Sequence, residues 1–319
     1  MGGGSIGTRH IRNLLRMRPT VEIGVYDPGL SSSPVQDENV HLVMGPDVQG
    51  KWDAVLICSP TSYHYGHMSW AISKSIPCFV EKPICLPGQV DLSRNDFLAA
   101  WSDSIPVMVG YNLYFHPWFQ EVKRIVTGGK LGRVVAYAGE FSHYLPYWRG
   151  DRDSYSRHRA QGGGVLLDCI QDLDLMLELG GPWNADTGAT IRSSRVGDIT
   201  EDSEDIALVE LRSPSLKSGM LRLDYLGHRR IRSIKVIGTL GTLLWRSERH
   251  APSGEDSETL SYYRNSLVTT RSGESVPLIA SSYVDELRAF LHWVEGGAAP
   301  VLPNPFRALD LLKERAGLW

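Results

Sequence analysis

The chain begins MGGGSIGTRHIRNLLR, residues 1–16, and this stretch decides the fold of the first half. Gly2, Gly4 and Gly7 have the spacing G-x-G-x-x-G, and a helical pattern of apolar residues follows at once. Backbone N–H groups at the start of such a helix bind the pyrophosphate of a dinucleotide. Asp27 ends the next apolar run, where an acid holds the ribose 2′-hydroxyl of NAD and repels the 2′-phosphate of NADP. The pattern therefore predicts NAD binding, with an Asp-Pro-Gly turn as the alternative role for Asp27.

In this fold a buried β-strand precedes the glycine turn, whereas only Met1 precedes it here. That first strand is central to the sheet. Without it, its neighbours would carry unpaired main-chain groups, at a cost of about 1–3 kcal/mol each. We therefore expect that the natural protein has further apolar residues before Met1, because the gene start was assigned late or the chain was shortened.

Length and composition bound the class of protein. The 319 residues exceed what one core usually holds, which predicts two domains. The net charge of -3 is not the excess of positive charge that is typical of nucleic-acid-binding proteins. No apolar run reaches about 18 residues, so no membrane span or signal peptide is expected. The four scattered cysteines form no C-x-x-C pair, which predicts reduced thiols in a cytoplasmic protein and no metal site.

The patterning changes near residue 116. Up to that point, short apolar runs alternate with helical patterns, which predicts a parallel α/β Rossmann domain over residues 1–116 with its first strand apparently missing. A linking helix follows, and then runs that alternate apolar and polar residues between turns. These runs predict an α+β domain over residues 117–319 with a large, mostly antiparallel, open-faced sheet. The polar, aromatic stretch before Arg159 reads as a loop.

Several motifs occur in a characteristic order. Glu81-Lys82-Pro83 directly follows the apolar run IPCFV, and CSPTSYHYGH ends an earlier one. With the glycine motif and Asp27, they resemble the Gfo/Idh/MocA family of NAD(P)-dependent sugar oxidoreductases. The resemblance covers nearly the whole chain, because VGYNLYFHPWF, GKLGRVVAYAGEF, GGGVLLD and GTLGTLLW are similar to later family segments in the same order.

The resemblance implies that Lys82 lies beside the nicotinamide and assists proton transfer. An ammonium there can stabilise a developing alkoxide. A lysine in a surface turn is the alternative, although the carboxyl end of a parallel strand is where ligands bind. For His64, a structural role at a helix start is an equal alternative to cofactor contact. The cofactor-binding residues implied are Gly2, Gly4, Ser5, Ile6, Gly7, Asp27, Ser59, Pro60, Thr61, His64, Glu81 and Asn112.

One departure from the family concerns catalysis. Similar members carry D-x-x-H-x-x-D after the glycine cluster; here Asp168 and Asp174 match, but Gln171 stands where the histidine belongs. An amide does not titrate near neutral pH and can only orient a hydroxyl through hydrogen bonds. The resemblance then leaves Lys82 as the proton acceptor, with Asp168 and Gln171 as orienting catalytic residues. A further departure is Tyr114, where the family commonly has arginine.

The stretch from FSHYLPYWRG to the glycine cluster resembles the family's substrate pocket. Aromatic faces stack on sugar rings, and guanidinium groups bind phosphate or carboxylate in bidentate fashion. A solvated loop or a subunit contact is the alternative, and for His143 a packed or solvated histidine is favoured over substrate contact. The implied substrate-binding residues are Lys82, Tyr147, Trp148, Arg149, Tyr155, Asp168 and Gln171.

These features predict an NAD-dependent oxidoreductase acting on a secondary alcohol of a sugar, cyclitol or nucleotide-sugar. The open sheet face would otherwise expose an apolar patch, so a homodimer or homotetramer is expected. Gln171 supports an alternative, a catalytically inactive NAD- or sugar-binding sensor or regulatory protein of the same fold. A chain that no longer folds is a third reading. Dehydration or glycosidic cleavage through transient oxidation, which also occurs in the family, stays open.

Overall fold

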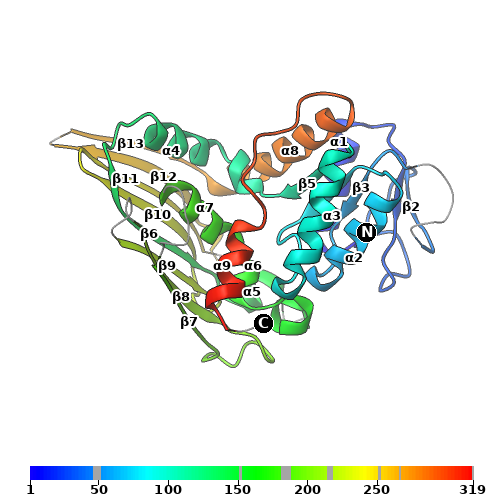
Figure 1. Cartoon of the computed structure of the whole chain (residues 1–319), viewed down its shortest axis with the longest axis horizontal. Coiled ribbons are helices and arrows are strands. Elements are labelled where there is room, and N and C mark those ends of the chain that lie inside the picture. The colour runs from blue at the N-terminus through cyan, green and yellow to red at the C-terminus, as the bar shows by residue number, and fades with distance from the viewer. Residues whose placement is uncertain are drawn as a thin grey trace. The chain divides into compact units, whose positions relative to one another are not determined.

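The computed structural model describes residues 1–45, 52–150, 153–180, 188–213, 218–250, 253–265 and 267–317. The chain forms two compact units, whose elements are labelled in Figure 1. The first comprises Met1–Asn112 and Tyr283–Phe306, and the second comprises Leu113–Ser282 and Arg307–Trp319. The sequence suggested a single crossing near residue 116, whereas residues 283–306 return to the first unit.

The strands described in the first unit pair in parallel and form two groups. β1 (Ile23–Val25) pairs with β2 (Val40–Leu42). In the other group, β4 (Cys78–Glu81) lies between β3 (Val55–Ile57) and β5 (Val107–Gly110). Every residue of β4 and β5 is buried, as expected for strands with both sheet faces covered. The parallel α/β domain that the sequence predicted is confirmed.

Helices alternate with these strands. α1 follows the glycine turn, α2 follows β3, and α3 precedes β5; α8 begins in the second unit and ends in the first. The core of the first unit contains Phe79, Val80, Met108 and Met68. The bounds are α1 (Ser5–Met17), α2 (Thr61–Ser73), η1 (Pro87–Gln89), α3 (Val90–Ser102) and α8 (Ser275–Val294).

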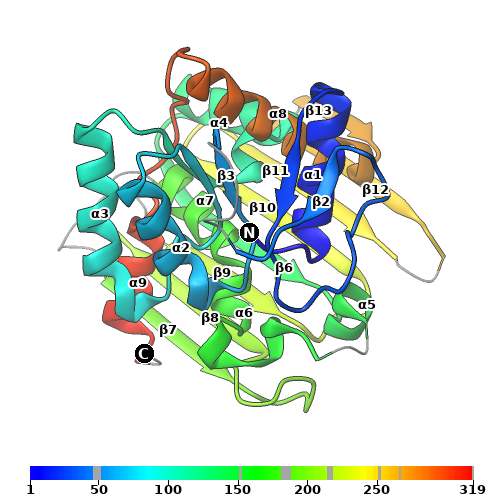
Figure 2. The same ribbon diagram turned by 90° about the vertical axis from the view of Figure 1, so that its right-hand side faces the viewer.

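The main chain of Met1 and Gly2 joins the two groups of strands. The Met1 amine donates to the Leu56 carbonyl at 2.7 Å, and the Cys58 N–H donates to the Met1 carbonyl at 2.7 Å. On the other side, the Gly2 N–H donates to the Tyr26 carbonyl at 2.9 Å. Figure 2 shows the N-terminus between β3 and the β1–β2 pair. Met1 therefore has the hydrogen bonds of the last residue of a central strand.

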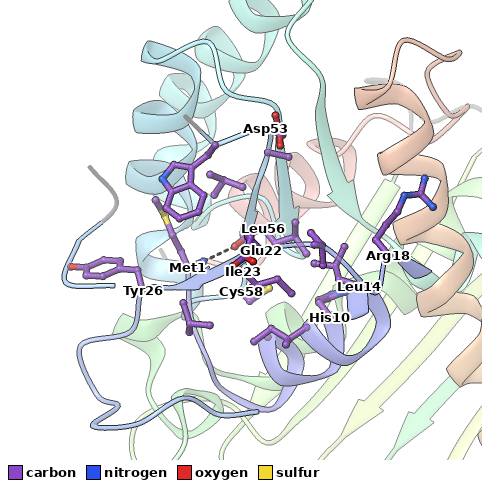
Figure 3. Close-up of a pocket in the computed structure, with 18 of the residues that line it drawn as sticks. Met1, His10, Leu14, Arg18, Glu22, Ile23, Tyr26, Asp53, Leu56 and Cys58 are labelled. Atoms are coloured by element: carbon purple, nitrogen blue, oxygen red, sulfur yellow. Dashed lines mark hydrogen bonds between the residues drawn. The ribbon is translucent and has the colours of Figure 1, made fainter. Parts of the chain in front are cut away.

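A cavity of about 770 Å³ lies next to Met1, between β1 and β3 (Figure 3). Its lining includes Ile23 of β1, Leu56 of β3, Leu14 of α1 and Leu291 of α8, together with Trp52. The cavity thus occupies the position at which the sequence led us to expect the first strand. Strand edges and apolar side chains form much of its wall, which suits a polypeptide strand, and the charged Arg18, Glu22, Asp53 and Glu295 also line it.

Among the described residues, the second unit contains one mixed sheet with the order β13-β12-β11-β10-β6-β9-β8-β7. Only the β6–β9 pairing in it is parallel. The mostly antiparallel sheet is confirmed, although the sequence did not identify β7, β12 and β13. The bounds are β6 (Val134–Ser142), β7 (Gly188–Ser194), β8 (Ile206–Arg212), β9 (Ser218–Asp224), β10 (Arg230–Gly238), β11 (Thr242–Arg249), β12 (Asp256–Arg264) and β13 (Leu267–Gly273).

Helices cover one face of this sheet, as Figure 1 shows for α4 and α7. Side chains on the covered face, such as Trp245 and Val209, are buried, whereas Leu208 and Met220 on the opposite face are exposed. The alternation gives the open face that the sequence predicted. The helices are η2 (Asn112–Phe115), α4 (Pro117–Thr127), α6 (Val165–Asp168), α7 (Ile170–Gly180) and α9 (Arg307–Arg315).

The segment expected as a loop before Arg159 is partly helical. It contains α5 (Leu145–Arg149), η3 (Tyr155–Arg157) and η4 (Arg159–Gln161). Pro146 suits the first turn of a helix, where its missing N–H costs nothing, and the buried Leu145 anchors the turn. The prediction of a continuous loop was therefore wrong. No helix in the described ranges is long and apolar enough to cross a bilayer.

Filling the cavity with a strand should stabilise the protein. We expect a Val/Ile-rich extension of about five residues, fused ahead of Met1, to raise Tm by about 5 °C or more. It would pair with β1 and β3, and it would replace the Met1 ammonium, whose pKa burial lowers, by an amide N–H. Calorimetry measures Tm, with a Gly/Ser extension of equal length as control. Equal Tm values for both extensions would contradict the assignment of the cavity.

Candidate active site

The three glycines of the turn differ in how much room a side chain would have at their positions. Gly2 has φ +91°, and a Cβ there would lie 2.6 Å from the Cys58 carbonyl. A Cβ on Gly7 would lie 2.0 Å from the Gly2 carbonyl oxygen. At Gly4 a Cβ would meet nothing within 4 Å. Gly2 and Gly7 are therefore required by the fold, whereas Gly4 leaves open space in front of the backbone.

That open space lies at the N-terminus of α1. Gly4 is the N-cap, no side chain caps this end, and the first turn, which includes Ser5 and Ile6, has no acidic residue. The first N–H groups of a helix have no partner within the helix and carry the positive end of its dipole. An open, uncapped helix start fits the pyrophosphate of a dinucleotide.

Asp27 lies directly beside this turn. Its Oδ2 accepts the Gly3 N–H at 2.7 Å, and its Oδ1 accepts the Gly29 N–H at 2.9 Å. The second bond is that of an Asx turn, so the structural role considered for Asp27 is real. The first bond holds the carboxylate next to the glycines, where a ribose hydroxyl would need it.

The carboxyl ends of β3, β4 and β5 supply the next group of candidates. Ser59 follows β3, Lys82 follows β4 and Asn112 follows β5, and the three strands pair in parallel. Pro60 is the N-cap of α2, and Thr61 is its buried first residue. The sheet therefore brings Ser59, Lys82 and Asn112 to one edge.

His64 ties two of these strand ends together. Its Nε2 lies 2.8 Å from the Ser59 carbonyl, and its Nδ1 lies 2.7 Å from the Pro83 carbonyl. Desolvation lowers the pKa of this buried imidazole. His64 is thus placed to hold the chain that flanks Lys82, which agrees with the structural alternative considered for it.

Glu81 points into a buried cluster. Its Oε1 lies 2.8 Å from His10 Nε2, and ligating atoms of His10, Glu81 and Glu286 lie within 4.8 Å of one another. Both Glu286 oxygens are buried without a hydrogen-bond partner in the described residues. Burial, followed by the Glu81 charge, raises the pKa of Glu286 well above its usual range. A proton retained on Glu286 therefore relieves the repulsion between the two carboxylates.

In the second unit, Asp168 is the centre of a hydrogen-bond network. Its fully buried carboxylate accepts from Arg149 at 3.0 Å, Tyr155 at 2.8 Å, Ser156 at 2.7 Å and Tyr225 at 3.1 Å. Burial, and then Asp168, raise the pKa of the Tyr225 phenol well above its usual value. Asp168 is thus an anion held by four donors, which suits orientation rather than proton uptake.

Gln171 and Tyr114 also have defined partners. Gln171 Oε1 accepts the Leu113 N–H at 3.1 Å. The Tyr114 hydroxyl donates to Asp174 at 2.6 Å, and Arg307 binds Asp174 with two nitrogens, at 2.6 and 2.9 Å. The family commonly has an arginine at the position of Tyr114. Here Arg307, from another part of the chain, supplies a guanidinium to the same hydrogen-bond network.

The remaining substrate candidates surround α5. Arg149 lies 4.3 Å above the Trp148 ring, and His143 stacks on the same ring at 5.5 Å. Tyr147 is exposed and meets Tyr144 edge-on. The structure thus brings Trp148, Arg149, Tyr155 and Asp168 together within the second unit. Sequence reasoning missed His10, Ser156, Tyr225, Glu286 and Arg307, which carry no motif of their own.

Comparisons with known proteins match both units. Residues 1–111 match the model of an oxidoreductase family with an NAD-binding Rossmann fold, and residues 119–244 match the GFO/IDH/MocA C-terminal domain. The uncharacterized oxidoreductase YrbE of Bacillus subtilis (strain 168) is 28% identical over 143 residues, 41% of this chain and 40% of that protein. The scyllo-inositol 2-dehydrogenase (NAD(+)) of the same strain is 23% identical, over 98% of this chain and 90% of that protein. A levoglucosan dehydrogenase structure, in complex with NADH and levoglucosan, has a TM-score of 0.75 at 15% identity and covers 98% of this chain and 93% of that chain.

The glycine turn gives a matched pair of variants. Gly4→Ala should weaken NAD binding about tenfold or more, because its methyl group fills the open space, while Tm stays near that of the parent chain. Gly7→Ala should instead destabilise the fold by about 1–3 kcal/mol through its clash with Gly2. Fluorescence titration with NAD and a thermal melt measure the two effects. Unchanged NAD affinity in Gly4→Ala would refute the assignment of the helix start at Gly4 as the pyrophosphate site.

Glu286 should make stability depend on pH. The folded protein retains a proton that the unfolded chain releases near pH 4.5. The resulting stabilisation is fully present below that pH and is lost as the pH rises through the folded-state pKa. Tm of the parent chain should therefore fall more steeply from about pH 5 to pH 9 than Tm of Glu286→Gln. Half-buried Asp285→Asn, which removes the neighbouring carboxylate paired with Arg288, is the control, and parallel pH profiles for parent and Glu286→Gln would argue against the retained proton.

Proposed function

Because the chain belongs to the Gfo/Idh/MocA oxidoreductase family, we propose that it transfers a hydride between a secondary alcohol and the nicotinamide of NAD. The alcohol belongs to a sugar, cyclitol or nucleotide-sugar. The observation that carries the proposal is the open, uncapped helix start at Gly4, flanked by two glycines that the fold itself requires. Bound NAD would supply the hydride acceptor, and every other task falls to side chains of this protein.

NAD is proposed rather than NADP because of Asp27. The carboxylate is held beside the turn by the Gly3 N–H. A negative charge there accepts hydrogen bonds from a ribose hydroxyl and repels a 2′-phosphate. Ser59, Thr61 and Asn112, at the carboxyl edge of the sheet, are the proposed contacts to the rest of the cofactor.

Lys82 is the proposed proton acceptor. It is half-buried and follows β4 at the edge where parallel sheets bind ligands. A lysine amine there can take the hydroxyl proton while hydride leaves the same carbinol carbon, which yields the ketone and an ammonium. Asp168 and Gln171 are the proposed orienting groups, since neither a carboxylate held by four donors nor an amide is suited to proton uptake.

The substrate class rests on two supports. The scyllo-inositol 2-dehydrogenase acts on a cyclitol, and the levoglucosan dehydrogenase structure holds an anhydrosugar. The second unit also groups Trp148, Arg149 and Tyr155 around Asp168, which gives aromatic and charged groups of the kind that bind polyols. The open face of the sheet, with Leu208 and Met220 exposed, supports a homodimer or homotetramer.

A sensor or regulatory protein is the second candidate function. Gln171 favours it, because its amide cannot titrate and its oxygen is bound to the Leu113 N–H. Such a protein would bind NAD and a polyol without forming NADH. A Gln171→His variant that gains activity in a chain otherwise inactive would support this reading.

The enzymatic proposal predicts NADH formation that depends on Lys82. With NAD and a panel of inositols and sugars, at least one substrate should give an absorbance increase at the NADH band. Lys82→Ala should lower kcat by about 10²-fold or more, the usual contribution of a general base, and leave NAD affinity within about twofold.

Lys235→Ala is the matched control, because Lys235 is an exposed lysine on β10. It should leave both kcat and NAD affinity unchanged. NADH formation that persists in Lys82→Ala would overturn the assignment of the proton acceptor. NAD and polyol binding without turnover in the parent chain would favour the sensor.

A further inference from the structure

The helix-covered face of the large sheet carries a cluster of cationic side chains near one end of β10. Arg230 and Arg232 lie two residues apart on β10 and therefore project from the same face. Arg232 pairs with Asp172 of α7, which identifies this face as the covered one. Arg249 of β11 is directly opposite Arg230, and His143 follows β6 beyond the Ser142–Ile231 pair.

The arginines of this region fall into two classes by their partners. Arg149 is bound to Asp168, and Arg232 is bound to Asp172 at 2.7 and 3.0 Å, so both are neutralised. Within the described residues, neither Arg230 nor Arg249 lies within 4.0 Å of a carboxylate oxygen. Arg230 donates only to the Ser247 hydroxyl at 2.6 Å, and its buried Nε has no partner there.

Two neighbouring acids offset part of this positive charge without forming an ion pair with Arg230. Glu258 and Asp256 favour the Arg230 charge from a distance. Glu258, however, is bound to the Trp245 indole and lies 3.4 Å from His116. Burial first, and then Arg232, lower the pKa of Arg230 to about 10. Like charges directly opposite each other in a sheet are destabilising, but Asp256 of β12 lies directly opposite Arg249 and opposes the repulsion between Arg230 and Arg249.

Aromatic side chains pack against His143, which lies beside the arginines of this cluster. The Trp148 ring stacks on His143 with an interplanar angle of 23° and meets Phe141 edge-on at 5.7 Å. Burial, followed by the neighbouring arginines, lowers the pKa of His143 to about 3, so its ring is neutral. A neutral imidazole offers one hydrogen-bond donor and adds no further positive charge. Through Trp148, the cluster adjoins Arg149 and thus the Asp168 network.

We propose that Arg230 and Arg249, with His143 beside them, bind the anionic group of an acidic sugar, either a carboxylate or a phosphate. Two guanidinium groups that have no ion pair within the described part of the chain offer planar donor sets that match both anions. The bound anion would relieve the repulsion between Arg230 and Arg249 and would satisfy the Arg230 Nε. This inference rests on the proposed function and narrows its substrate class from polyols in general to acidic sugars.

The test compares acidic with neutral sugars on the full chain. Calorimetric titrations use glucuronate and glucose 6-phosphate against glucose, and inorganic phosphate alone as a minimal anion. At least one acidic sugar should bind about tenfold or more tightly than glucose, with an affinity that falls as salt rises. The preferred acidic sugar identifies carboxylate or phosphate as the group recognised.

Variants locate the site. Arg230→Gln and Arg249→Gln should each abolish the preference for the acidic sugar, while each variant still unfolds cooperatively without ligand, which shows that it is folded. Arg192→Gln, an exposed arginine of β7 without an ion pair in the described chain, should change nothing. An unchanged preference for the acidic sugar in folded Arg230→Gln and Arg249→Gln, or glucose binding equal to that of both acidic sugars, would overturn the proposal.

Failure of the two proposals is distinguishable. NADH formation from neutral sugars, unaffected by Arg230→Gln and Arg249→Gln, would overturn the anion site and leave the oxidoreductase. Arginine-dependent binding of an acidic sugar without NADH formation would keep the anion site and overturn the dehydrogenase.

Discussion

Parallel hydrogen bonding among β3, β4 and β5 is the constraint on which the first unit depends. Because parallel strands all end at the same edge, the residues that follow them must lie there together, however far apart they are in sequence. This ladder places Lys82 between Ser59 and Asn112. His64 then lies within hydrogen-bond distance of the Ser59 and Pro83 carbonyls and, as a neutral imidazole, donates to one of them, which helps to hold the turn that carries Lys82.

In the second unit, the cost of burying carboxylates determines which segments are held together. A buried carboxylate is costly unless donors compensate it, and Asp168 receives four of them. Those donors come from α5, η3 and the end of β9, so the charge of one aspartate fixes three segments of the substrate region. Asp174 plays the same part for Tyr114 and Arg307. Arg230 is the opposite case, a cation for which the described residues supply no carboxylate within ion-pair distance.

The elements that could be predicted from the sequence are those with a strong apolar periodicity. The motifs that could be predicted are those in which the backbone comes so close that only glycine fits. Gly2 and Gly7 could be predicted because no other residue fits their positions. The partners of Asp168 could not, because Ser156 and Tyr225 are ordinary residues until the fold brings them together. The helix α5 was missed for a related reason: Pro146 and Gly150 read as loop residues, yet Pro146 suits a first turn and Gly150, at φ +71°, ends the helix. The cluster of cationic side chains around Arg230 was also missed, because only the register of β10 and β11 places Arg230 opposite Arg249.

The cavity beside Met1 is too large to be empty, so what fills it affects the stability of the first unit. A closed, empty void costs about 24 cal/mol per Å³, so a volume of about 770 Å³ would cost about 18 kcal/mol, more than the roughly 5–15 kcal/mol stability of a typical domain. The space therefore has to hold water or polypeptide. Water can satisfy the edges of β1 and β3, but it leaves Leu14, Trp52 and Leu291 wetted. A strand satisfies the edges and covers the apolar walls as well. Because Met1 and Gly2 already make the bonds to Leu56, Cys58 and Tyr26 that end such a strand, the turn keeps its geometry with either filling, and cofactor binding and stability can be tested separately.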